Sequence, residues 1–174
     1  MPGILMVAIA CTTVPPNQAS PNDGTGGDAV PSEYPVVTYA DQGREHLTTG
    51  SPAPAYNSNP PTSGPHAPNT VPCGIHADPV PDVVAVHNLE HGVVVIHYLP
   101  TIPREDVAAL VDAVAGFESH FVVAPRANNP APITLSAWTI QLSLDEVDAA
   151  AVRWFWDEYS GQGPEVVDCP IEVG

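Results

Sequence analysis

The chain has 174 residues, with twenty Asp and Glu against four arginines and no lysine, and a formal net charge of −16 at pH 7. A surface of that charge repels nucleic-acid phosphates and attracts cations, so the composition argues against nucleic acid as a partner and favours a metal ion. The length predicts one domain with an appended arm.

The first eleven residues, MPGILMVAIAC, contain an apolar run that is too short to span a bilayer. The run ends in Ala-Ile-Ala before Cys11, which is typical of a bacterial lipobox, where the signal is removed and the cysteine carries lipid. No basic residue precedes the run, which leaves open a start codon further upstream or a cytosolic protein with an apolar N-terminus. We interpret residues 1–11 as a signal, with lipidation at Cys11 and a location on the cell surface or in the periplasm.

The remaining cysteines, Cys73 and Cys169, form an even pair, as expected in an oxidising compartment. A disulfide between them would stabilise the fold by roughly 4–5 kcal/mol through the chain entropy of the closed loop. The alternative is that Cys73, three residues before His76 in CGIH, binds a metal as a thiolate.

Residues 12–55 are rich in proline, glycine and serine and predict an arm or linker. Within this arm, EYPVVTYA (residues 33–40) alternates enough to form a strand. Such a strand would add to an edge of its own sheet or to a neighbouring copy, and the second option suggests a surface assembly or filament.

Residues 56–174 predict a globular α+β domain. Its first part, residues 56–81, contains too many prolines for a long helix or central strand and indicates an ordered loop. The order β-β-α-β-β-α follows, giving an antiparallel or mixed sheet of about four strands with two helices on one face. The predicted strands are DVVAVHN (82–88), VVVIHYLP (93–100), HFVVAP (120–125) and ITLSAWTIQL (133–142).

Both predicted helices carry start signals. Pro103 suits the first helical position of PREDVAALVDAVAGF, whose early acidic residues favour the positive end of the helix dipole. Ser143 followed by Glu146 predicts a capping box for the second helix, which Gly161 or Gly163 ends.

Seven histidines accompany only four arginines, and the sharpest pair is His87 and His91 in HNLEHG. If this stretch is one helical turn stopped by Gly92, the two rings share a face at about 5–6 Å between Cβ atoms and can reach one ion. The spelling H-x-x-E-H also matches a zinc protease pattern, but that mechanism needs a helix of several turns. We therefore interpret Glu90 as a residue that orients an imidazole.

A third ligand must come from elsewhere in the chain. His66 is the favoured third ligand because the prolines of PPTSGPH fix its backbone. His76 is the second candidate. His97 is the third, and it could instead be a core histidine. His46, in the arm, and His120 are typical surface positions. The cluster could also be a hydrogen-bonded polar loop without metal. Copper is favoured over zinc because imidazoles suit Cu(II), and copper affinities usually exceed those of zinc.

Four stretches resemble the bacterial domain-of-unknown-function 3105 family, whose members are typically exported or membrane-tethered. They are YNSNPPTSGPH (56–66), HNLEHGVVVIHY (87–98), AW (137–138) and a closing F-x-x-x-Y with PE (155–165). The resemblance covers roughly residues 45 to 165 and implies that the first two motifs meet at one site. It implies no catalytic residue, and Val93 stands where the family often doubles the glycine.

The sequence thus predicts an exported, lipid-anchored protein that binds copper, or alternatively zinc, without catalysis. The predicted site comprises His66, His87, His91, Glu90 and His76. The alternatives are a structural subunit that assembles through the arm, with metal at its interfaces, and a zinc metallohydrolase that uses H-x-x-E-H.

Overall fold

A computed structural model describes residues 34–48, 50–52 and 54–169. The fold is α+β with a mixed sheet, which confirms the predicted class. In chain order the elements are β1 (Val37–Thr38), β2 (Gly74–Ile75), α1 (Asp82–Glu90), β3 (Val94–Tyr98), α2 (Arg104–Val114), β4 (Phe121–Pro125), β5 (Ile133–Ala137), β6 (Ile140–Leu144) and α3 (Ala149–Tyr159).

The sheet has six strands in the order β1-β6-β5-β3-β4-β2. The pairs β3–β4 and β4–β2 are parallel, and α2 is the crossover that carries the chain from β3 back to the start of β4. The pairs β3–β5, β5–β6 and β6–β1 are antiparallel.

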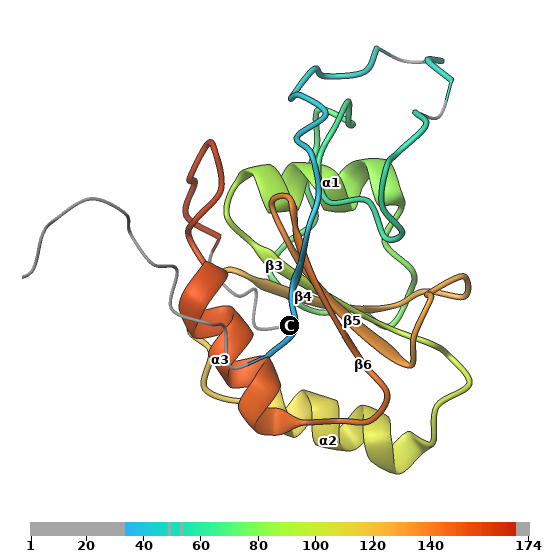
Figure 1. Ribbon diagram of the computed structural model, residues 1–174, viewed down its shortest axis with the longest axis vertical. Coiled ribbons are helices and arrows are strands. Elements are labelled where there is room, and N and C mark those ends of the chain that lie inside the picture. Colours follow the sequence, from blue (N-terminus) through green and yellow to red (C-terminus); the bar gives the residue numbers. More distant parts are fainter. Residues whose placement is uncertain (1–33, 49, 53, 170–174) are drawn as a thin grey trace, which may run out of the picture. The chain divides into compact units, whose positions relative to one another are not determined.

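Helices cover both faces of the sheet. Figure 1 shows α2 and α3 on one side and α1 on the other. Residues of β3 alternate between two hydrophobic cores, so Val94 and Ile96 pack with α2 and α3 while Val95 packs with α1. Two helices share one face as predicted, and α1 is an addition.

The prediction of a strand at residues 82–88 was wrong, because this segment forms α1. Residues 84–90 are all buried, the polar His87, Asn88 and Glu90 among them, so the helix lacks the exposed polar face that marks a surface helix. A short apolar run of this kind cannot be assigned to helix or strand by periodicity.

The strand count was also too low. The edge strands β1 and β2 have two residues each, which is too short for a periodic signal. The segment 133–142 was read as one strand, but β5 and β6 form a hairpin that turns at Trp138 and Thr139, with Thr139 at φ 62°. No Gly or Asn marks this turn, so the usual hairpin signal is missing.

The capping box predicted at Ser143 was wrong as well, since Ser143 lies in β6 opposite Thr134. Asp148 caps α3 instead, and its carboxylate accepts hydrogen bonds from the backbone N–H groups of Ala150 and Ala151. Asp148 was a suitable cap, but Ser143 had the more familiar spacing to a glutamate.

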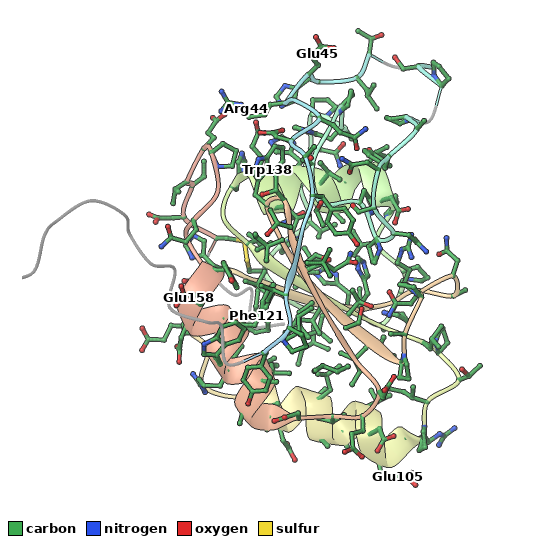
Figure 2. The ribbon with its side chains drawn as sticks, viewed as in Figure 1. Arg44, Glu45, Glu105, Phe121, Trp138 and Glu158 are labelled. Atoms are coloured by element: carbon green, nitrogen blue, oxygen red, sulfur yellow. A yellow bond between two sulfur atoms is a disulfide. The ribbon has the colours of Figure 1, made fainter. Side chains whose placement is uncertain are left out.

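Figure 2 shows Glu105 on α2 and Glu158 on α3 pointing outward from the domain. A disulfide joins Cys73 and Cys169, the pairing that the cysteine count favoured, so Cys73 is not a free thiolate ligand. Within the described residues no helix is long and apolar enough to cross a membrane. The lipobox and Cys11 lie outside those residues.

Candidate metal centre

The motif HNLEHG forms the C-terminal end of α1. His87, Glu90 and His91 are spaced i, i+3 and i+4, which places them on one face of the helix. The helix ends where Gly92 adopts φ 83°; the Gly92 N–H donates to the Leu89 carbonyl at 3.0 Å and the Val93 N–H to the Asn88 carbonyl at 3.0 Å. This Schellman motif fixes the last turn, as the predicted stop at Gly92 requires.

The motif PPTSGPH forms the loop that carries His66, whose side chain is fully buried. The Tyr56 hydroxyl donates to the Pro65 carbonyl at 2.8 Å, and the Thr139 N–H donates to the Thr62 carbonyl at 3.0 Å. These bonds join the loop to a neighbouring segment and to the β5–β6 turn, so His66 is held by the fold rather than by local sequence alone.

The segment before the motif brings a third histidine to the same place. The His66 N–H donates to the Glu45 carbonyl at 2.9 Å, and the Leu47 N–H donates to the His66 carbonyl at 2.7 Å, so His46 and His66 form a parallel bridge. Their rings lie 5.0 Å apart. Figure 1 shows this blue segment running from β1 to the region of α1, and Figure 2 shows Glu45 pointing outward from it.

Three imidazoles and one carboxylate therefore converge, each offering a ligand atom within 4.8 Å of the others: His46, His66, His87 and Glu90. Glu90 is the centre of the group. Its Oε2 lies 3.0 Å from His66 Nε2, 3.9 Å from His87 Nε2 and 4.0 Å from His46 Nε2. His46 is the exposed member, with 52% of its side chain accessible.

The hydrogen bonds of two rings set their tautomers. His66 Nδ1 donates to the Gly64 carbonyl at 2.8 Å, and His87 Nδ1 donates to the Ala67 carbonyl at 2.8 Å, because a carbonyl only accepts. In the neutral ring the lone pair is then on Nε2, which faces the cluster. Backbone carbonyls bonded to the outer nitrogen are the usual support of metal-binding histidines.

The cluster leaves buried polar atoms without hydrogen bonds. His66 Nε2 and Glu90 Oε2 are both inaccessible and have no hydrogen-bond partner. Two facing acceptors need a positive group between them, either a proton that makes an ion pair or a metal ion. Because two further imidazoles approach the same carboxylate oxygen, the donor set fits a metal ion.

His87 is held in the form that a metal needs. Burial lowers its pKa, and repulsion from the His91, His66 and His46 rings acts in the same direction, while the hydrogen bond to the Ala67 carbonyl opposes them. The net effect favours the neutral ring at pH 7 and keeps the Nε2 lone pair available.

The other predicted site residues, His91 and His76, are not members of this group of four. His91 Nε2 is 3.1 Å from His87 Nε2, so His91 contacts one member of the cluster. His76 Nε2 bonds to the Pro72 carbonyl at 2.9 Å. His97 is buried on β3 and His120 bonds to Ser119 and to the Val167 carbonyl.

Sequence reasoning missed His46 and one support of α1, Asn88. His46 was read as a surface residue of the arm, and only the long-range pairing with His66 places it in the cluster. Asn88 binds the backbone of Val71 at both N–H and C=O, at 3.1 and 2.9 Å. Its position inside HNLEHG was the available signal for a structural role.

The segment after α3 closes over the end of α1. The Glu165 N–H donates to the Glu90 carbonyl at 3.0 Å, and the Gly161 N–H donates to the Gly92 carbonyl at 2.8 Å. A Cβ on Gly163 would collide with the Glu90 carbonyl oxygen and with Gly92. This close packing explains why a glycine stands at position 163.

The model of one protein family, described as "Protein of unknown function (DUF3105)", matches residues 47–170. The chain belongs to this family. The DUF3105 match includes both motifs whose residues meet here, PPTSGPH and HNLEHG, and it begins one residue after His46. No curated protein and no solved structure matches the chain.

Proposed function

We propose that this protein is an exported, lipid-anchored copper-binding protein that carries out no reaction of its own. One observation carries the proposal: the buried His66 Nε2 and Glu90 Oε2 face each other at 3.0 Å without a hydrogen-bond partner, beside two more imidazoles. The four residues of that cluster are the proposed ligands, with Glu90 bound directly to the metal.

The four ligand atoms are close enough to bind one metal ion after a small movement toward one another. Ligands bound at about 2.0 Å lie no more than about 4 Å apart across a metal ion. The donor atoms here lie within 4.8 Å of one another, so a shift of under about 1 Å brings them into range. His46 has the freedom for that shift because its side chain is half exposed.

Copper suits the donor set and the proposed compartment better than zinc does. Imidazole and carboxylate ligands favour Cu(II), which binds such sites more tightly than zinc. The two methionines of the chain, Met1 and Met6, both precede Cys11, so a mature chain that starts at Cys11 has no thioether for Cu(I). The surrounding negative charge raises the local concentration of any cation.

The position of Glu90 argues against the alternative of a zinc hydrolase. In that mechanism the glutamate is a general base that must reach a metal-bound water. Here the carboxylate is 3% exposed, and its Oε2 lies among the imidazole nitrogens. Glu90→Gln should therefore weaken copper binding; retained metal together with lost hydrolysis of a peptide or ester would favour the hydrolase instead.

Elemental analysis tests the metal. The untagged protein, purified from copper-supplied cells and passed through a desalting column, should contain copper in equal amount to the chain. His66→Gln should lose it, while the matched control His76→Gln should keep it, because His76 bonds to a loop carbonyl. Metal-free wild-type protein would refute the proposal, and zinc in place of copper would correct its identity.

Lipid anchoring is the second part of the proposal. Its support is the Ala-Ile-Ala-Cys spelling before the arm, together with a disulfide that fits an oxidising compartment. Cys11→Ser should move the protein from the membrane fraction to the soluble fraction and abolish acyl labelling. A mature protein whose mass includes residues 1–10 would contradict the anchor.

Assembly through the arm remains the alternative role. The exposed Val37 of β1 lies on an edge of the sheet, as a docking strand would. However, β1 pairs with β6 of its own chain, which occupies the contact that a neighbour would need. Light scattering across a range of concentrations tests this role: a constant monomer mass would exclude it.

A further inference from the structure

His91 lies at the end of α1 with one prominent contact, to His87. The Nε2 atoms of the two rings are 3.1 Å apart, and their ring centroids are 4.4 Å apart. His91 is not one of the four residues whose ligand atoms lie within 4.8 Å of one another, and it is more accessible than the buried His66, His87 and Glu90. The proposed function leaves it without a role.

The contact between the two rings depends on the lone pair that copper would take. Because His87 Nδ1 donates to the Ala67 carbonyl, the neutral ring accepts on Nε2, and His91 must donate to it. Copper bound to His87 removes that acceptor. His91 therefore has to release its hydrogen bond whenever the cluster is loaded.

The spacing of the two nitrogens is itself suited to a metal ion. Two ligands at about 2.0 Å from one ion and 3.1 Å from each other subtend about 100° at the metal. That angle lies between the values of about 90° and 109° for square-planar and tetrahedral sites. No movement of the helix is needed, since both rings project from its last turn.

We propose that His87 and His91 form an outer copper position through which Cu(II) enters and leaves the inner cluster. His87 serves both positions. An ion first held by His87 and His91 exchanges His91 for His66, Glu90 and His46 while it stays bound to His87, so it never returns to water between the two. The inner position is the stable one because it offers four ligands, one of them an anion.

This proposal rests on the proposed function and makes a separate kinetic prediction. A group that acts along the path changes the rates of loading and release by the same factor, and His91 affects the equilibrium only through the one hydrogen bond that it gives up on loading. His91→Gln should slow both rates by roughly tenfold or more, while the copper Kd stays within about threefold of the wild type. An inner ligand behaves differently: His46→Gln should raise the Kd.

The experiment uses the full-length protein with copper sulfate as the probe. Stopped-flow absorbance of the Cu(II) ligand-field band gives the loading rate, transfer of copper to a chelator gives the release rate, and chelator competition gives the Kd. His76→Gln controls for the loss of a histidine outside the cluster, and His91→Asn repeats the test with a second side chain. Circular dichroism verifies that each variant is folded.

The outcomes separate the two proposals. Equal slowing of both rates in both His91 variants supports the entry position. A raised Kd with an unchanged loading rate would make His91 an ordinary ligand and overturn it, as would unchanged rates. If the wild-type protein binds no copper, the proposed function fails and the entry position fails with it.

Discussion

The disulfide can be tested with a single substitution, Cys169→Ala, which removes the bridge at its partly buried end. The bridge closes 96 residues of chain. In the chain-entropy model a loop of this length contributes about 4.7 kcal/mol to the free energy of unfolding at 25 °C. A domain of ordinary stability has about 5–15 kcal/mol in total, so the loss would take a large share of it.

The loss should be measured by urea unfolding of wild type and Cys169→Ala, with a check that the m-values agree. We expect the variant to be less stable by about 3–5 kcal/mol. Reductant should destabilise the wild type equally and leave Cys169→Ala unchanged. A difference below about 1 kcal/mol at equal m-values would refute the entropic reasoning.

The same variant tests the link between the bridge and the metal centre. Cys169 ends the segment whose Glu165 and Val167 N–H groups donate to the carbonyls of Glu90 and His91, at 3.0 and 3.4 Å. Without the bridge this segment loses its tether, and the last turn of α1 loses its cover. The copper affinity of Cys169→Ala should therefore fall under conditions where the variant is still folded; an unchanged affinity would show that the segment is not needed there.

Three further predictions concern other residues of the domain. Burial, and then the charge of Arg126, lower the pKa of His97 to about 4. As the pH falls below about 6.5, His97 is therefore protonated in the unfolded chain while it stays neutral in the folded chain. Unfolding free energy should thus fall by about 3 kcal/mol as the pH drops from 6.5 to 4, and His97→Gln should remove that share of the slope. Gly163→Ala should weaken copper binding, because its Cβ meets the Glu90 carbonyl, whereas the exposed neighbour Gln162→Ala should not; equal affinities in both would contradict the close packing. Arg126→Met should destabilise the fold by roughly 2 kcal/mol in urea unfolding, since Arg126 binds Asp82 with two bonds of 2.9 Å, while Arg104→Met, on the exposed start of α2, should change little.

The elements with strong local signals were predictable from the sequence. Helix α2 was expected from its apolar stripe and acidic first turn, and β3 from a continuous apolar run. Helix α1 was not, because its burial on all sides removes the contrast between faces that periodicity needs. The two-residue edge strands depend on distant partners and leave no local pattern.

The candidate site likewise combines residues that local motifs predict with a residue that only long-range contacts place. His66, His87 and Glu90 belong to two recognisable sequence motifs, PPTSGPH and HNLEHG, and the structure brings these three residues together. His46 could not be found in this way, because its place depends on backbone bonds between residues 45–47 and His66. Long-range pairing of a proline-rich segment is not encoded in a short window of sequence.

The short edge strands bear on the proposed anchoring at a membrane surface. Each border of the sheet ends in a two-residue strand next to prolines, Pro35 beside β1 and Pro72 near β2, which have no N–H to donate. A sheet with such borders offers little backbone for another copy to pair with, which is how soluble β proteins avoid aggregation. If the proposed lipid anchor holds many copies side by side, they should then remain separate, each with its own metal centre.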